Sequence, residues 1–134
     1  MEAFFGNWKL VSSENFEEYM RAVGFGEEQV QVGNIVTPVI SIYQDGEKVV
    51  TKLKTSIISS ENSFILGKEF DENVAGKQYR SVVHLDGGKL VNTRKWDDKT
   101  SFLTREIQDG KMIMTMRCDD IVAVRTYEKI SEVD

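Results

Sequence analysis

The sequence predicts a mainly β fold, an antiparallel sandwich or barrel, with one helical hairpin near its N-terminus. Turn signals recur at short spacing between strand-like runs, and Asp-Gly between alternating segments is a strong hairpin signal. Many short strands joined by such turns indicate a sandwich or a barrel. The turn signals are Asp45-Gly46, Asp86-Gly87-Gly88, Asp97-Asp98, Asp109-Gly110 and Asp119-Asp120. One segment, residues 15 to about 36, has helical spacing instead.

Length and composition suit one soluble domain spanning residues 1–134. The chain has 134 residues, of which 40% are hydrophobic and 29% are charged, an ordinary globular composition. A net charge of −5 argues against nucleic acid as a partner, because phosphate binding needs surplus Lys and Arg. No apolar run is long enough to span a membrane, and the N-terminus does not resemble a secretory signal. With Cys118 as the single cysteine, these features favour a cytosolic protein.

The helical hairpin is predicted from capping and spacing. Asn15 can cap the first helix, and Glu18, three residues on, completes a capping-box pattern. Gly24 can end this helix, and a second short helix is predicted from about Glu27 to Ile35. The residues with helical spacing in the first helix are Phe16, Tyr19, Met20 and Val23. The hairpin is too small to be a domain, so we expect it to cover an open end of a barrel.

The last three predicted strands can be aligned through their turns. Two-residue turns at Asp109-Gly110 and Asp119-Asp120 place Arg105 and Arg125 on either side of Met114. Since opposed residues share a face, one face carries Leu103, Arg105, Ile107, Met112, Met114, Met116, Ala123, Arg125 and Tyr127. The backbones of the two arginines are then roughly 10 Å apart, two strand spacings. Both side chains are long enough to converge on one small anion.

This mixed face is unusual for a solid core, because unpaired buried charge is costly. The three strands place no carboxylate on it. A cavity that holds water and an anionic ligand would resolve the problem. The alternative is that this face lies outside and both arginines are solvated. A slip of one residue at Asp119-Asp120 would also change the faces.

The preceding strands favour the interior. A turn at Asp97-Asp98 places Leu90 opposite Arg105 and leaves two lysines on the other face. It also adds a third cation, Arg94, to the Arg105 face, toward the turn. A turn at Asp45-Gly46 likewise leaves two lysines outside. The residues that it groups on one face are Pro38, Ile40, Ile42, Val49, Thr51 and Leu53.

Several stretches together form a specific pattern: GNWKLVSSENFEEYM, SFILGKEFDE, LDGGKLV, KWDD, TREIQDGK and VRTYEK. With them the chain resembles, over essentially its whole length, the intracellular lipid-binding protein family, in particular fatty-acid-binding proteins of the heart, adipose and myelin type. The resemblance implies a ten-stranded, flattened antiparallel β-barrel (β-clam) with a helix-turn-helix lid between the first two strands. Such a barrel encloses a water-filled cavity for one lipid. The resemblance also implies that Arg105 of TRE, with Arg125 and Tyr127 of RTY, binds the ligand carboxylate.

The sequence departs from the family pattern at four places. The second helix has Glu27 and Glu28 where many relatives have a Thr-Arg pair nearby, so the lid is less basic and docking to anionic membranes is less favoured. Ile57 replaces an aromatic residue common at the cavity mouth, and NVAGKQ follows FDE where relatives often carry an acidic pair and a basic residue. Arg94 stands where a neutral residue is common, which makes it a candidate for changing ligand choice or the internal water network.

These features favour a cytosolic carrier of long-chain fatty acids, which we expect to be a monomer with no cofactor and at most transient membrane contact. Retinoic acid or another hydrophobic carboxylate is the alternative ligand within the same fold. A structural role in membrane binding is disfavoured by the weakly basic lid and the net charge of −5. An enzyme is disfavoured because His84 is the single histidine, and no nucleophile–base pair or metal-ligand cluster stands out.

Overall fold

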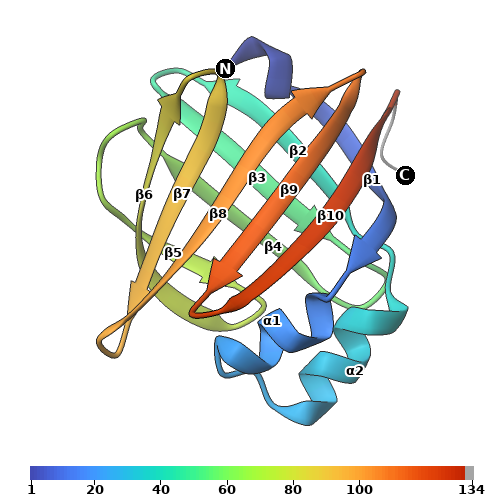
Figure 1. The fold of residues 1–134 in the computed structure, drawn as a ribbon. Helices are drawn as coiled ribbons and strands as arrows, with labels where there is room; N and C mark the ends of the chain where they lie inside the picture. The colour runs from blue at the N-terminus through green and yellow to red at the C-terminus, as the bar shows by residue number, and fades with distance from the viewer. Residues whose placement is uncertain (132–134) are drawn as a thin grey trace.

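The computed structural model describes residues 1–131 as ten antiparallel strands in a nearly closed barrel, with two helices across one end (Figure 1). The last three residues of the expected domain, 132–134, lie outside the described part. In chain order the elements are η1 (Glu2–Phe4), β1 (Gly6–Glu14), α1 (Phe16–Ala22), α2 (Glu27–Ile35), β2 (Val39–Asp45), β3 (Lys48–Lys54), β4 (Ser59–Phe64), β5 (Phe70–Val74), β6 (Lys77–Asp86), β7 (Lys89–Trp96), β8 (Lys99–Gln108), β9 (Lys111–Cys118) and β10 (Ile121–Ile130). The predicted fold, with its lid between the first two strands, is therefore confirmed.

The strand order follows from hairpins between consecutive strands. The order is β4-β3-β2-β1-β10-β9-β8-β7-β6-β5, so that β1 joins β10 and the first half of the barrel meets the second. The C-terminal registers are those that the turns predicted: Arg105 and Arg125 both lie opposite Met114, and Leu90 lies opposite Arg105. No slip occurs at Asp119-Asp120, because Cys118 pairs with Ile121.

The turn predicted at Asp45-Gly46 is wrong by one residue. Asp45 pairs with Lys48, so the turn residues are Gly46 and Glu47. Gly46 has a φ of +62°, and a glycine at the first of two turn positions is what a type II′ hairpin requires. The register of β2 against β3 therefore moves by two residues, which places Ile42 opposite Thr51. Because the period of a strand is two, the predicted apolar set still shares one face.

The lid has the predicted boundaries, but the predicted capping box of α1 is wrong. Asn15 has a left-handed backbone with a φ of +61°, and its side chain makes no capping hydrogen bond. Its Nδ2 instead donates to the Val122 carbonyl of β10 at 3.0 Å. The Asn15 side chain, which the sequence pattern predicted to cap α1, thus forms a tertiary hydrogen bond to β10 instead. Gly24, with a φ of +99°, follows α1 as expected.

Helix α1 is bound to the barrel through buried polar contacts. The Tyr19 hydroxyl lies 2.7 Å from the Ser101 hydroxyl, and Ser101 donates its own proton to the Arg117 carbonyl. Since a hydroxyl carries one proton, Tyr19 is the donor in the first contact. The Cys118 thiol donates to the Ala22 carbonyl at 3.8 Å. These contacts attach α1 to β8 and β9. Neither helix of the lid, nor any other in residues 1–131, is long and apolar enough to cross a membrane.

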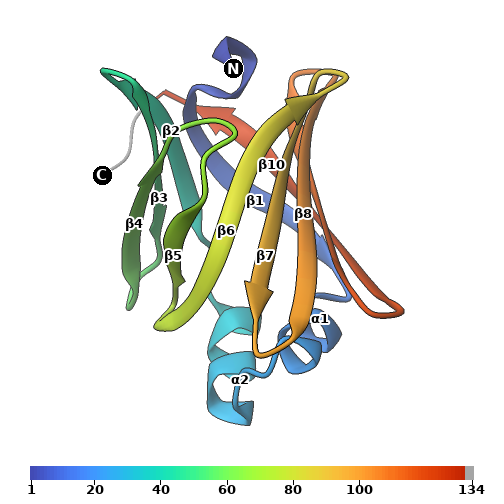
Figure 2. The ribbon, with the colours of Figure 1, turned by 90° about the vertical axis from the view of Figure 1, so that its left-hand side faces the viewer.

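The barrel has a gap between β4 and β5, the two ends of the strand order (Figure 2). Within the described residues no backbone ladder joins these strands. The side-chain amide of Asn62 bridges the gap: its Nδ2 donates to the Asn73 carbonyl at 2.7 Å, and its Oδ1 accepts from the Asn73 backbone N–H at 2.9 Å. Nearby, the rings of Phe64 and Phe70 stack with centroids 5.2 Å apart. One amide therefore replaces a missing pair of ladder hydrogen bonds.

We expect Asn62→Ala to loosen this gap. Losing two hydrogen bonds should lower the free energy of unfolding by roughly 1–3 kcal/mol, and the Asn73 amide should exchange its hydrogen faster. Denaturant unfolding and residue-resolved hydrogen exchange measure the two effects. Gln108→Ala, which removes an exposed side-chain amide bound to Glu106, is the control and should change neither. Unchanged exchange at Asn73 in the Asn62 variant would contradict the role of the bridge.

Candidate functional site

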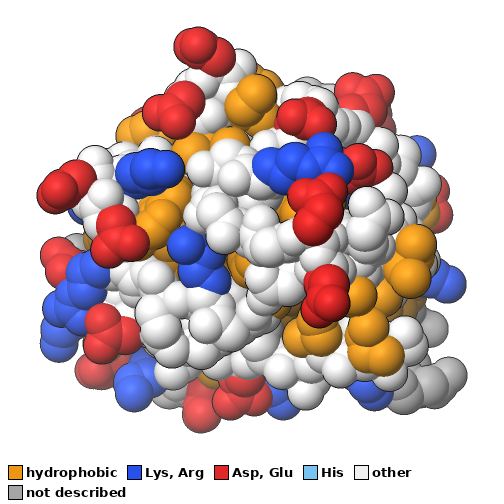
Figure 3. All heavy atoms as spheres, turned by 90° about the horizontal axis from the view of Figure 1, so that it is seen from below, with side chains coloured by type: hydrophobic (Ala, Val, Ile, Leu, Met, Phe, Trp, Pro, Cys, Tyr) orange, Lys and Arg blue, Asp and Glu red, His pale blue; other side chains and the backbone are white. Residues whose placement is uncertain are grey.

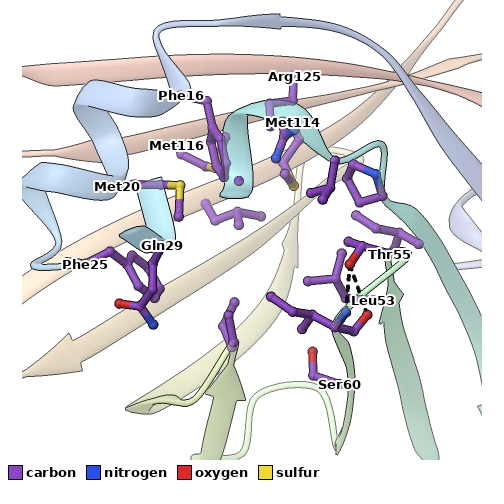
Figure 4. A pocket seen from close by; sticks show the side chains of 18 of the residues that line it. Phe16, Met20, Phe25, Gln29, Leu53, Thr55, Ser60, Met114, Met116 and Arg125 are labelled. Atoms are coloured by element: carbon purple, nitrogen blue, oxygen red, sulfur yellow. Dashed lines mark hydrogen bonds between the residues drawn. The ribbon is translucent and has the colours of Figure 1, made fainter. Parts of the chain in front are cut away.

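A cavity of about 380 Å³ lies in the barrel under the lid (Figure 4). Its walls are mostly apolar and include residues of the lid, the β3–β4 side and the C-terminal strands, together with β5 to β7. The lid contributes Phe16, Met20 and Phe25; the β3–β4 side contributes Leu53, Ile57 and Ile58; the C-terminal strands contribute Leu103, Met114 and Met116. Methionine side chains are flexible and polarisable, so this wall can adapt to ligands of several shapes.

All three predicted site residues line this cavity. Arg105, Arg125 and Tyr127 are buried, with exposed fractions of 7%, 5% and 1%. The alternative in which this face is solvated is therefore wrong. The Nε atoms of Arg105 and Arg125 are buried and have no hydrogen-bond partner among the described residues. No carboxylate in residues 1–131 forms an ion pair with either guanidinium group. Both guanidinium groups are thus buried cations without a counter-ion in the described protein.

The lid covers Arg125 directly. Its guanidinium carbon lies 3.8 Å from the centroid of the Phe16 ring, a cation–π contact between β10 and α1 (both side chains are labelled in Figure 4). Burial lowers the pKa of the Arg125 guanidinium, and the nearby Tyr127 hydroxyl acts in the opposite direction. The π face of Phe16 partly replaces the water that the cation has lost.

Arg105 is in a more strained electrostatic position. Burial first, and then the charge of Arg94, lowers the pKa of Arg105 to about 10. It therefore stays protonated at neutral pH but at an energetic cost. Burial raises the pKa of the Tyr127 hydroxyl, against the effect of the two arginines, so Tyr127 is a neutral donor at neutral pH. Two cations and one hydroxyl donor consequently face the same space.

A carboxylate that the sequence analysis did not find neutralises Arg94. Glu72 of β5 accepts hydrogen bonds from Arg94 Nε at 3.0 Å and from Arg94 Nη2 at 2.9 Å, a bidentate pair. Ser81 donates to Glu72 Oε1 at 2.8 Å, and Asn92 Nδ2 lies 3.2 and 3.3 Å from the two carboxylate oxygens. Burial alone would raise the pKa of Glu72, but these partners outweigh it and lower the pKa to about 2. Arg94 is thus paired, unlike the other two cations.

Glu72 could have been found from one further turn. The β5–β6 turn lies at Ala75-Gly76, since Val74 pairs with Lys77. That register sets Glu72 opposite Tyr79, and β6–β7 pairing sets Ser81 opposite Arg94. Because Ser81 lies two residues from Tyr79, the same face carries Glu72 and Arg94. Ala75, and not Asp or Asn, precedes Gly76, so this turn lacks the sequence signal by which the other turns were located.

The comparisons with known proteins agree with this architecture. Residues 5–130 match the model of the lipocalin / cytosolic fatty-acid binding protein family. Among solved structures, the REP1-NXSQ fatty acid transporter is 34% identical, with a TM-score of 0.92 over 99% of this chain and 100% of that one. The Schistosoma mansoni fatty acid binding protein in complex with arachidonic acid is 32% identical, with a TM-score of 0.92 over 98% of each chain. The wild-type fluorescent protein UnaG is 40% identical, with a TM-score of 0.90 over 96% of this chain and 98% of that one.

The Glu72–Arg94 pair should make stability depend on acid. Because the folded pKa of Glu72, about 2, lies below its ordinary value of 4.5, its contribution is complete above 4.5 and is lost as pH falls toward 2. The loss should be on the order of 3 kcal/mol in the free energy of unfolding. Denaturant unfolding at neutral pH and at a series of acidic values measures it.

The comparison variant is Glu72→Gln with Arg94→Gln, which removes both charges and should flatten this acid dependence. Glu61→Gln is the control, since it removes an exposed partner of Lys52 whose pairing contributes little. A double variant that loses stability in acid as steeply as the wild type would show that other groups cause the loss.

Proposed function

The chain belongs to the lipocalin / cytosolic fatty-acid binding protein family, and we propose that it binds and transports long-chain fatty acids in the cytosol. The observation that carries this proposal is a pair of buried arginines that have no counter-ion among the described residues and line a mostly apolar cavity. A fatty acid has the matching chemistry, one carboxylate on a long apolar chain. The complex of a relative with arachidonic acid, also a long-chain carboxylate, supports the assignment.

In this proposal Arg125 and Tyr127 hold the carboxylate directly. Both are donors on β10, and their side chains lie on one face because they are two residues apart. Arg105, across Met114 from Arg125, contributes by its charge or through a bridging water. The ligand carboxylate would serve as the counter-ion of these two buried cations.

The apolar tail supplies most of the binding free energy. Burying about 14 methylenes at about 0.8 kcal/mol each gives about 11 kcal/mol before any cost is subtracted. Ordering the chain and losing its motion offset part of this gain, which is consistent with submicromolar affinity. The proposed activity is binding and release of one ligand by a monomer, without a chemical step or a cofactor.

We expect Arg125→Gln to weaken oleate binding roughly ten- to a hundredfold, because a hydrogen bond to a charged group contributes about 1.5–3 kcal/mol. Oleyl alcohol, which has no carboxylate, should bind the variant about as well as the wild type. Titration calorimetry with both ligands measures the difference.

Arg117→Gln is the matched control, because Arg117 lies exposed on the neighbouring strand and should not affect either ligand. The variant at Arg125 should also fold, since it removes an unpaired buried cation along with its desolvation cost. Equal losses for oleate and oleyl alcohol would refute the proposed role of Arg125.

The charges of the lid bear on how the ligand leaves. Arg21 of α1 is paired with Glu18 at 2.8 Å and with Glu27 at 2.8 Å, and Glu17 lies 3.6 Å away. Its charge is therefore already balanced within the lid. Figure 3, which views the lid end, shows acidic and basic side chains intermingled on this face. We propose that contact with anionic membranes is at most transient and that ligand transfer proceeds mainly through water.

Transfer of a fluorescent fatty acid to vesicles should then hardly change in rate as the vesicles gain anionic lipid or number. Glu28→Lys with Gln31→Lys makes α2 basic at exposed positions and leaves the Arg21 pairs intact. In this variant the transfer rate should rise with the anionic lipid content and with the number of vesicles. Asp86→Lys with Gln44→Lys gives the same change in net charge at the far end of the barrel and should not make the rate rise. A wild-type rate that climbs with vesicle number would contradict transfer through water.

A further inference from the structure

The buried charges of the barrel are unevenly paired. Among the described residues, the buried charged side chains are Glu72, Arg94, Arg105 and Arg125, and all four line the same cavity. Glu72 and Arg94 form a bidentate pair. In the part of the chain that the structure describes, Arg105 and Arg125 have no such partner, and their Nε atoms lack hydrogen bonds. The cavity lining therefore has a neutralised end, at Glu72 and Arg94, and a cationic end, at Arg105 and Arg125.

We propose that Glu72 determines ligand specificity: by occupying Arg94, it restricts the cavity to ligands with a single carboxylate. The inference rests on the proposed function, since it concerns the same cavity and the same carboxylate chemistry. Glu72 occupies the position at Arg94 that the second carboxylate of a dicarboxylate ligand would otherwise take.

The hydrogen bonds of the pair support this role. Glu72 Oε1 accepts from Ser81 and Arg94, Glu72 Oε2 accepts from Arg94, and Asn92 Nδ2 lies within reach of both oxygens. A ligand carboxylate arriving here would meet a second carboxylate, and the donors that it needs are already engaged. Placing it there would bury an unpaired negative charge, which is strongly unfavourable.

The spacing of the two ends suits the two heads of one ligand. Arg94 pairs across the sheet with Ser101, and Ser101 and Arg105 are four residues apart on β8. Their backbones are therefore separated by roughly 13 Å along the strand. A dicarboxylate of medium length, such as dodecanedioate, could reach from the Arg105 end to Arg94 if Glu72 did not occupy it.

The electrostatics of Arg105 show that the two ends influence each other. After burial, the charge of Arg94 is the next cause that lowers the pKa of Arg105, and Glu72 opposes it. Removing the charge of Glu72 would leave three unpaired guanidinium groups in one cavity. In a protein without the Glu72 charge, the second carboxylate of a dicarboxylate ligand would relieve that repulsion. In the wild type it would not, because Glu72 already neutralises Arg94.

The test compares dodecanoate with dodecanedioate by titration calorimetry, so that chain length is constant. The wild type should prefer dodecanoate. Glu72→Gln should shift the ratio of the two dissociation constants toward dodecanedioate by roughly ten- to a hundredfold, the effect of one charged hydrogen-bonded pair. A folded Glu72→Gln protein with an unchanged ratio would overturn the proposal.

Two further variants keep the test decisive if Glu72→Gln does not fold. Glu72→Gln with Arg94→Gln removes both charges and should lose the gain for dodecanedioate. Arg94→Gln alone leaves an unpaired Glu72 carboxylate, whose negative charge opposes a second carboxylate in the same cavity, so it should bind dodecanoate at least roughly tenfold more weakly than the double variant. Equal affinities of these two variants for dodecanoate would also overturn the proposal. Wild-type protein that binds neither oleate nor dodecanoate would instead refute the proposed function.

Discussion

Burial of guanidinium groups inside an apolar barrel is the constraint on which the rest of this structure depends. A buried cation is costly unless it is paired or hydrogen-bonded. The buried arginines of this chain are in two different situations. Glu72, with Ser81 and Asn92, satisfies Arg94 within the protein. Among the described residues, Arg125 contacts the π face of Phe16, and its Nε has no hydrogen-bond partner. The Glu72–Arg94 pair contributes to stability, whereas Arg125 keeps a burial cost that the ligand carboxylate would offset in the proposed function.

The contact between Arg125 and Phe16 links this buried cation to the lid. Phe16 is the first residue of α1, and α1 is attached to β8 and β9 through Tyr19 and Cys118. The ring that covers the cation thus belongs to the helix with buried polar anchors on the barrel. The gap between β4 and β5 is bridged instead by a single amide, that of Asn62. Different contacts therefore fasten the two places: a hydroxyl and a thiol hold α1, whereas an amide and a stacked ring pair join β4 and β5.

Much of the fold and of the site was predictable, because period-two strands and two-residue turns fix which residues share a face. Turn signals containing Asp located the C-terminal registers, and those registers place Arg105, Arg125 and Tyr127 on one face. Where the turn signal was absent, at Ala75-Gly76, the carboxylate of Glu72 was missed. The capping box at Asn15 failed because a contact 107 residues away in the chain outweighed a local preference. Local rules thus determine faces, and long-range contacts determine which partners meet.

In the proposed function, two arginines without a counter-ion among the described residues would let the cavity favour carboxylates over apolar chains without a head group. Arg105 and Arg125 bear the cost of burial, and burial together with the charge of Arg94 lowers the pKa of Arg105 to about 10. Had each arginine a carboxylate such as Glu72 beside it, an incoming carboxylate would have to displace an existing partner. An apolar chain gains its burial energy in either case. The proposed selectivity for a charged head would therefore depend on leaving these two cations without a carboxylate partner in the protein, within a fold stable enough to bear them.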